Sequence, residues 1–150
     1  MPRVSRRRTI AAPVDEVWKL VSDPYSLPRW WPRTGRVENV EQKSGGRRSQ
    51  WTKVLETSEG RGVRADFRCL SSAEGERYVW GQELEGTPFA RHLRSSRIEI
   101  GLRQRDDGTQ VNLVSAQALK GMSRMGSPMM RRAQGAILEE ALDGIERALT

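Results

Sequence analysis

The sequence predicts an α+β domain in which seven antiparallel strands form a sheet around one long C-terminal helix, with two short helices after the first strand. Three observations lead to this fold class. The stretch from Gly126 to Thr150 is one amphipathic helical segment. The middle of the chain consists of short strand-like segments separated by turns. The links between these segments are too short for parallel connections, so neighbouring strands are expected to pair antiparallel.

The first part of the chain predicts one strand followed by two short helices. Residues Arg3 to Ile10 combine β-branched and long basic side chains before a turn, which is typical of a strand. Pro13 then begins a helix with acidic residues in its first turn, where the helix dipole favours them. Pro24 ends this helix because proline restricts the residue before it. The segment Tyr25 to Pro32 is interrupted by proline and allows only a turn or two of helix.

Six further strands are expected, separated by turns that are rich in glycine and acidic residues. The Asp107-Gly108 pair is a strong hairpin signal, since glycine tolerates the positive φ that a tight turn demands. The predicted strands are Val37 to Gln42, Ser49 to Glu56, Gly62 to Leu70, Arg77 to Leu84, Arg91 to Arg103 and Thr109 to Leu119.

The final helix begins at Ser127 and Pro128, a hydroxyl cap followed by a proline at the first helical position. Apolar residues recur at helical spacing, so the helix carries a stripe that needs an apolar surface. The small residues of the helix are expected to leave room between helix and sheet, with ordinary close packing as the alternative. They are Ala133, Gly135, Ala136, Ala141 and Gly144.

The composition predicts a single domain spanning residues 1–150. No apolar window is long enough for a transmembrane segment and no signal peptide is evident, so a cytoplasmic protein is expected. Cys69 is the only cysteine and His92 the only histidine, which excludes an internal disulfide and disfavours a metal site. No phosphate loop or dinucleotide fingerprint occurs, so no cofactor is expected.

The net charge of +7 raises the question of an anionic partner. Of the 26 basic residues, 22 are arginines scattered along the chain, and only Arg6, Arg7 and Arg8 are consecutive. On a strand these three would point to alternating faces, which disfavours a nucleic-acid site. The sequence leaves a homodimer open.

One stretch of the chain carries a resemblance to a known family. Its residues are Arg8-Thr9-Ile10-Ala11-Ala12-Pro13, Asp15-Glu16-Val17-Trp18, Val21, Asp23-Pro24, Leu27-Pro28 and Trp30-Trp31-Pro32. This run resembles the opening signature of the START-like (SRPBCC) superfamily, which includes the Bet v 1-like proteins and the polyketide cyclase/dehydrase branch. The resemblance implies a helix-grip fold with a cavity between sheet and final helix for an apolar or amphipathic small molecule. It does not imply one activity.

Candidate site residues follow from the expected position of each side chain. Aromatic rings on the strands can stack on a flat ligand, and Gln82 could orient a carbonyl or hydroxyl group. His92 is a weak catalytic candidate, because its unperturbed pKa suits proton transfer. For each residue, ordinary packing or a satisfied hydrogen bond is the alternative. The candidates are Trp30, Trp51, Phe67, Tyr78, Trp80, Gln82, Phe89, His92, Met130, Ala133 and Ile137.

Three functions remain open from the sequence. The first is a carrier or sequestering protein for a lipid, polyketide or quinone-like molecule. The second is a cyclase or dehydrase that uses the same cavity. The third, an adaptor for a protein or RNA, rests only on the positive charge. If the final helix forms one wall of the cavity, Ala133→Trp is expected to block ligand uptake without unfolding the domain.

Overall fold

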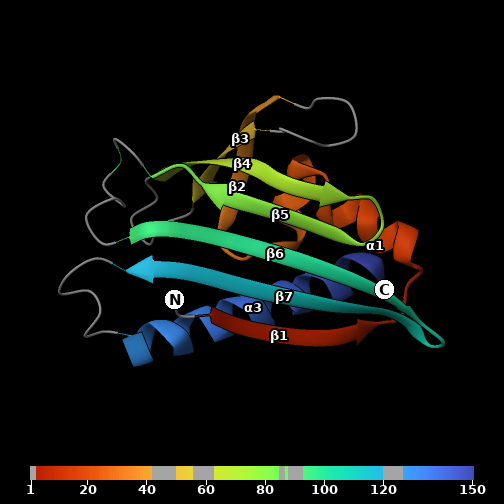
Figure 1. The fold of residues 1–150 in the computed structure, drawn as a ribbon. Coiled ribbons are helices and arrows are strands. Elements are labelled where there is room, and N and C mark those ends of the chain that lie inside the picture. The colour runs from red at the N-terminus through yellow and green to blue at the C-terminus, as the bar shows by residue number, and fades with distance from the viewer. Residues whose placement is uncertain (1–2, 42–49, 56–62, 85–86, 88–92, 120–126) are drawn as a thin grey trace.

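The computed structural model describes residues 3–41, 50–55, 63–84, 87, 93–119 and 127–150 (Figure 1). It confirms the predicted fold class: seven strands form one sheet in the order β1-β7-β6-β5-β4-β3-β2, with every neighbouring pair antiparallel. The elements are β1 (Arg3–Ile10), α1 (Val14–Val21), η1 (Pro24–Ser26), α2 (Leu27–Trp30), β2 (Thr34–Glu41), β3 (Gln50–Leu55), β4 (Val63–Ala73), β5 (Arg77–Gln82), β6 (Leu93–Arg105), β7 (Gly108–Leu119) and α3 (Ser127–Leu149).

Several strand ends differ from the prediction. β2 begins at Thr34 rather than Val37, and β6 ends at Arg105 rather than Arg103. β4 continues to Ala73, beyond the expected end at Leu70, because a register shift after Cys69 lets the strand keep pairing with β5. β5 ends at Gln82 rather than Leu84.

The hairpin between β6 and β7 depends on Gly108. Its φ of 144° disfavours a side chain, and a Cβ at this position would strike the carbonyl oxygen of Ile10. Arg105 pairs with Gly108, so Asp106 and Asp107 form the turn between them. The predicted hairpin is therefore confirmed, and its glycine is also the point at which the hairpin contacts the end of β1.

The main core lies between the sheet and the C-terminal half of α3. Leu138, Leu142 and Ile145 are fully buried there, together with Ile100 and Leu113 of the sheet. Figure 1 shows α3 running behind β1 and β7, with the C-terminus at the same end as α1.

The expectation that the small residues of α3 leave room is wrong at two positions. A Cβ on Gly144 would collide with the backbone of Trp30, so this glycine allows α2 to approach α3 closely. A Cβ on Gly135 would meet the guanidinium of Arg6 at 2.5 Å. Ala141 is fully buried as well. Close packing, the alternative that the sequence left open, describes these positions.

An ionic cluster joins β1 to α3. The Arg8 guanidinium donates hydrogen bonds to Asp143 at 2.6 Å and to Glu139 at 3.0 Å, and it lies 3.8 Å from Glu146. The hydrogen bond to Asp143 is the main reason why the pKa of Arg8 is raised. The cluster fixes the edge strand against the helix.

Candidate functional site

The inner face of the sheet, the face toward α3, carries a continuous group of aromatic rings. Trp51 and Phe67 are paired across β3 and β4, with ring centroids 6.2 Å apart and planes inclined by 12°. Tyr78 and Trp80 follow on β5, with centroids 6.5 and 6.1 Å from that of Trp51. All four rings are buried. We call these four residues the aromatic wall.

Two indoles from the segment after α1 close one end of the aromatic wall. Trp30 and Trp31 contact Trp80 edge-on, at centroid distances of 6.0 and 5.4 Å. Pro24 and Pro28 restrict this segment to short helical turns, and the buried Trp30 is held against Gly144 of α3. The proline-rich segment thereby places two more rings on the inner face.

A polar row continues the aromatic wall across the next strands. Gly81 pairs with Arg97, and in the same register Gln82 comes beside Ser96. Ser96 pairs with Gln117, whose side-chain amide donates a hydrogen bond to the Ser96 hydroxyl at 3.3 Å. The row that begins with Trp51 and Phe67 thus ends in amide and hydroxyl groups. Such groups can fix the orientation of a bound molecule.

A second polar contact links the sheet to α3. The buried hydroxyl of Ser115 donates a hydrogen bond to the side-chain oxygen of Gln134 at 2.7 Å. Ser115 precedes Gln117 on the same face of β7, so the polar row and this link are adjacent. The N-terminal half of α3 therefore faces a more polar part of the sheet than its C-terminal half does.

Lys53 is the one charged side chain among the buried residues of the described chain. It lies two positions after Trp51, on the inner face of β3, and is only 6% exposed. Its ammonium nitrogen is 4.7 Å from the ring centroid of Phe67 and 5.3 Å from that of Trp31. Burial lowers the pKa of this amine to about 8, and no acid in the described part of the chain offsets the effect.

Several buried polar atoms on these elements have no hydrogen-bond partner among the residues that the structure describes. They include the indole N–H groups of Trp30 and Trp51 and the side-chain oxygen of Gln117. Buried polar groups are normally paired, so such atoms mark places where a ligand or water completes the structure. The two indole groups can only donate a hydrogen bond, whereas the Gln117 oxygen accepts one.

The sequence-predicted candidates divide into three groups. Trp30, Trp51, Phe67, Tyr78 and Trp80 lie together, and Gln82 is half-buried beside them. On α3, Met130 and Ile137 are half-buried whereas Ala133 is exposed. Phe89 and His92 lie outside the described residues.

Lys53, Ser96, Gln117 and Gln134 were not among the sequence-based candidates. For Lys53 a signal was present, because strict alternation on the strand gives Lys53 the same orientation as Trp51. Ser96 and Gln117 require the strand registers, which the sequence does not fix, and Gln134 requires the packing of α3 on the sheet.

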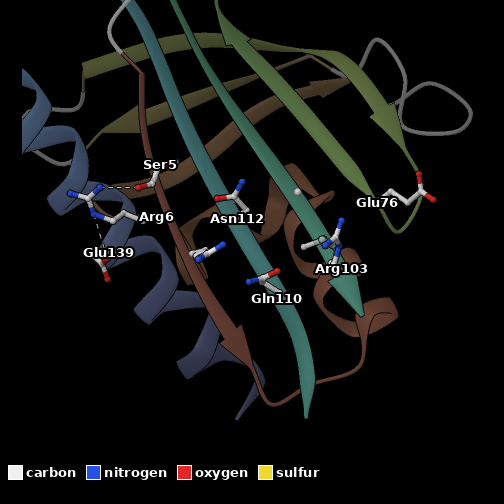
Figure 2. A pocket seen from close by; sticks show the side chains of 10 residues that line it. Ser5, Arg6, Glu76, Arg103, Gln110, Asn112 and Glu139 are labelled. Atoms are coloured by element: carbon white, nitrogen blue, oxygen red, sulfur yellow. Dashed lines mark hydrogen bonds and ion pairs between the residues drawn. The ribbon is translucent and has the colours of Figure 1, made fainter. Parts of the chain in front are cut away.

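A separate hollow of about 740 Å³ lies over the outer face of the sheet (Figure 2). Gly101 has no side chain and leaves space there, and Asn112 and Gln110 point outward on the neighbouring strand. Arg7 and Arg103 lie on either side. The lining is polar and charged, so it does not offer the apolar surface that an apolar ligand needs.

Two further properties concern metals and membranes. Among the described residues, no cluster of three or more histidine, cysteine or acidic side chains is placed to hold a metal ion. In the same part of the chain, no helix combines the length and apolar character needed to cross a membrane.

An antiparallel sheet wrapped around a long C-terminal helix is the helix-grip fold that the opening signature implied. A family model described as polyketide cyclase/dehydrase and lipid transport matches residues 1–150, and the chain belongs to this family. The resemblance seen in the opening signature is thereby confirmed.

Solved structures agree with this fold. A START superfamily protein from Mycobacterium smegmatis superposes with a TM-score of 0.78 at 19% identity, covering 98% of this chain and 96% of the other. TTHA0849 from Thermus thermophilus superposes with a TM-score of 0.76 at 20% identity, covering 99% of this chain and 97% of the other. The di-domain ARO/CYC StfQ from the steffimycin biosynthetic pathway superposes with a TM-score of 0.80 at 13% identity. The match covers 98% of this chain and 50% of StfQ, so this chain spans about half of that protein. A comparison with curated proteins finds no match.

Proposed function

We propose that this protein binds an apolar or amphipathic small molecule between the inner face of the sheet and α3, as a carrier or sequestering protein. The observation that carries the proposal is the set of unpaired polar atoms beside the aromatic wall, including the indole N–H of Trp51 and the amide oxygen of Gln117. A bound molecule with a flat apolar body and a few oxygen atoms would stack on the rings and pair with these groups. The family description, which includes lipid transport, supports the same function.

The proposal is tested by analysing what the purified protein contains. Native mass spectrometry of freshly purified protein, followed by solvent extraction, is expected to reveal a co-purifying apolar molecule. Trp51→Leu removes one stacking surface and is expected to weaken binding of that molecule about three- to tenfold. Trp18→Leu is the matched comparison, because it removes an indole of α1 that supports Tyr78 without belonging to the aromatic wall, and it is expected to weaken binding less than Trp51→Leu does. If the protein carries no apolar molecule and binds none when offered, the carrier function is wrong.

A cyclase or dehydrase is the second candidate, and Lys53 is the observation that favours it. An amine with a pKa of about 8 can accept a proton from a carbon between two carbonyl groups. The enolate carbon would then form a bond to a carbonyl carbon elsewhere in the same molecule, and the resulting alkoxide would take the proton back from the amine. His92, which lies outside the described residues, is the other candidate for proton transfer.

The two functions predict different results with a linear polyketide generated in situ. A cyclase changes the product profile, and Lys53→Met or His92→Ala removes the change. A carrier alters the amount of free polyketide but leaves its spontaneous products the same in kind. Product analysis by liquid chromatography and mass spectrometry distinguishes these results.

A further inference from the structure

We propose that the Lys53 amine binds an acidic oxygen, of a carboxylate or an ionised phenol or enol, on a planar ligand that stacks against the aromatic wall. This inference rests on the proposed ligand-binding function and specifies the chemical class of the ligand. It concerns a residue that neither the family description nor the opening signature involves.

The geometry places the amine directly against the aromatic wall. The Lys53 nitrogen lies over the Phe67 ring, 4.7 Å from its centroid, and that centroid is 6.2 Å from that of Trp51. Trp31 approaches the amine from α2, at 5.3 Å. The amine is thus within reach of an oxygen atom on a flat ligand that stacks against the aromatic wall near Phe67.

The acidic residues whose side chains the structure describes on the strands next to Lys53 are engaged elsewhere. On β4, Asp66 accepts a hydrogen bond from the Thr52 hydroxyl at 2.6 Å, on the opposite side of β3. On β2, Glu38 is cross-strand to Thr52, not to Lys53, and pairs with Arg36 at 2.5 Å. The charged residues near α2, Arg29 and Arg33, are basic and exposed. The protein thus supplies aromatic rings to the amine but no anion from its described residues.

The rings alone do not satisfy a buried ammonium group. The aromatic rings attract the positive charge, but they do not accept hydrogen bonds from its three N–H groups as an oxygen atom does. Moving an ammonium group out of water is costly unless it is paired and hydrogen-bonded. Because the nearby unpaired indole groups are also donors, the complementary ligand atom is an acceptor, and an anionic oxygen matches both the hydrogen bonds and the charge.

Three naphthalene probes of similar shape test this directly by isothermal titration calorimetry. They are 2-naphthoate, with a carboxylate; 2-naphthol, whose absorption spectrum reports ionisation of the hydroxyl; and 2-naphthamide, which is neutral. We expect the ligand-free wild-type protein at pH 7 to bind 2-naphthoate about 10- to 100-fold more tightly than 2-naphthamide, since a charge-assisted hydrogen bond is stronger than a neutral one. Bound 2-naphthol is expected to show the spectrum of its ionised form if phenols are accepted.

Lys53→Met serves as the matched variant, because methionine keeps the unbranched shape and removes the charge. It is expected to bind 2-naphthamide as the wild type does, within about threefold, and to lose the preference for 2-naphthoate. Lys53→Gln retains a neutral donor and is expected to restore only a small part of the preference. Circular dichroism of both variants shows whether the fold is retained.

A second measurement follows the amine itself. The chain has only four lysines, so a sample labelled with ¹³C at the lysine ε-carbon gives few NMR signals. One signal is expected to titrate near pH 8 in the ligand-free protein, to disappear in Lys53→Met, and to shift its midpoint upward when 2-naphthoate is added.

The outcomes separate the two proposals. Equal affinity of the wild type for 2-naphthoate and 2-naphthamide, or an unchanged preference in Lys53→Met, overturns the role of Lys53 and leaves ligand binding intact. A failure of the wild type to bind any of the three probes contradicts both proposals for planar ligands.

Discussion

Replacing Lys53 by methionine is expected to stabilise the ligand-free protein at neutral pH. Burial lowers the pKa of the amine from an ordinary 10.5 to about 8, a difference that corresponds to a cost of about 3 kcal/mol for keeping the charge in the folded state. The contacts with Phe67 and Trp31 offset about 0.5–2 kcal/mol of this cost. Lys53→Met should therefore raise the free energy of unfolding by about 1–3 kcal/mol.

The pH dependence gives a sharper form of the same prediction. Below pH 8 the amine is protonated in the folded and unfolded states alike, so its full cost is present. Between pH 8 and 10.5 the folded state has lost the proton while the unfolded state still binds it, and stability contributed by this group rises with pH. The advantage of Lys53→Met should shrink across this window and be nearly gone at pH 10.5.

Urea unfolding of both proteins, followed by tryptophan fluorescence from pH 6.5 to 10.5, measures these differences. The difference in the free energy of unfolding between wild type and variant does not contain the titration of the other lysines and the tyrosines, because both proteins share these residues. A variant that is less stable than wild type at pH 7, or a stability difference that does not change between pH 8 and 10.5, would refute the assignment of Lys53 as a buried amine without a counterion.

Three further predictions concern the packing of the fold. Gly144→Ala should lower the free energy of unfolding by about 1–3 kcal/mol, despite the better helix propensity of alanine. Gly135→Ala on the same helix meets only a movable side chain and should be neutral or stabilising. Chemical denaturation compares the two variants, and equal effects would contradict the close contact between α2 and α3. Arg8→Gln should lower the free energy of unfolding by about 1 kcal/mol, and this loss should diminish in 1 M salt because the cluster around Asp143 is partly exposed. A loss that salt does not change would show that packing rather than charge is responsible. Thr109→Val should lower the free energy of unfolding by about 1–3 kcal/mol, since it removes a buried hydrogen bond to the loop after β1, and an unchanged melting temperature would rule this out.

Much of the fold could be predicted from local features. The strand from Arg3 to Ile10 was placed correctly at both ends, and the hairpin at Gly108 was placed where the structure has it. These elements depend on alternation, on proline and glycine, and on short links, all of which act over a few residues. The end of β4 could not be predicted, because a register shift after Cys69 depends on its pairing with β5.

The candidate site was predicted only in part. Large rings on strands favour the interior wherever a core forms, so Trp51, Phe67 and Trp80 could be selected from the sequence. The inner position of Lys53 followed the same alternation, but a lysine is seldom buried without a partner. Ser96 and Gln117 become neighbours only through the register of β6 and β7.

The sequence by itself determined the element order, the antiparallel pairing and the family, because these depend on short-range patterns and on an opening signature. The tertiary structure alone decided what the glycines of α3 are for and which groups surround the buried Lys53 amine. Gly144 allows contact with Trp30 rather than leaving space, and the Lys53 amine ends between two rings that come from different elements. Both results depend on how close distant segments approach, which is set by the packing of the whole domain and not by any local pattern.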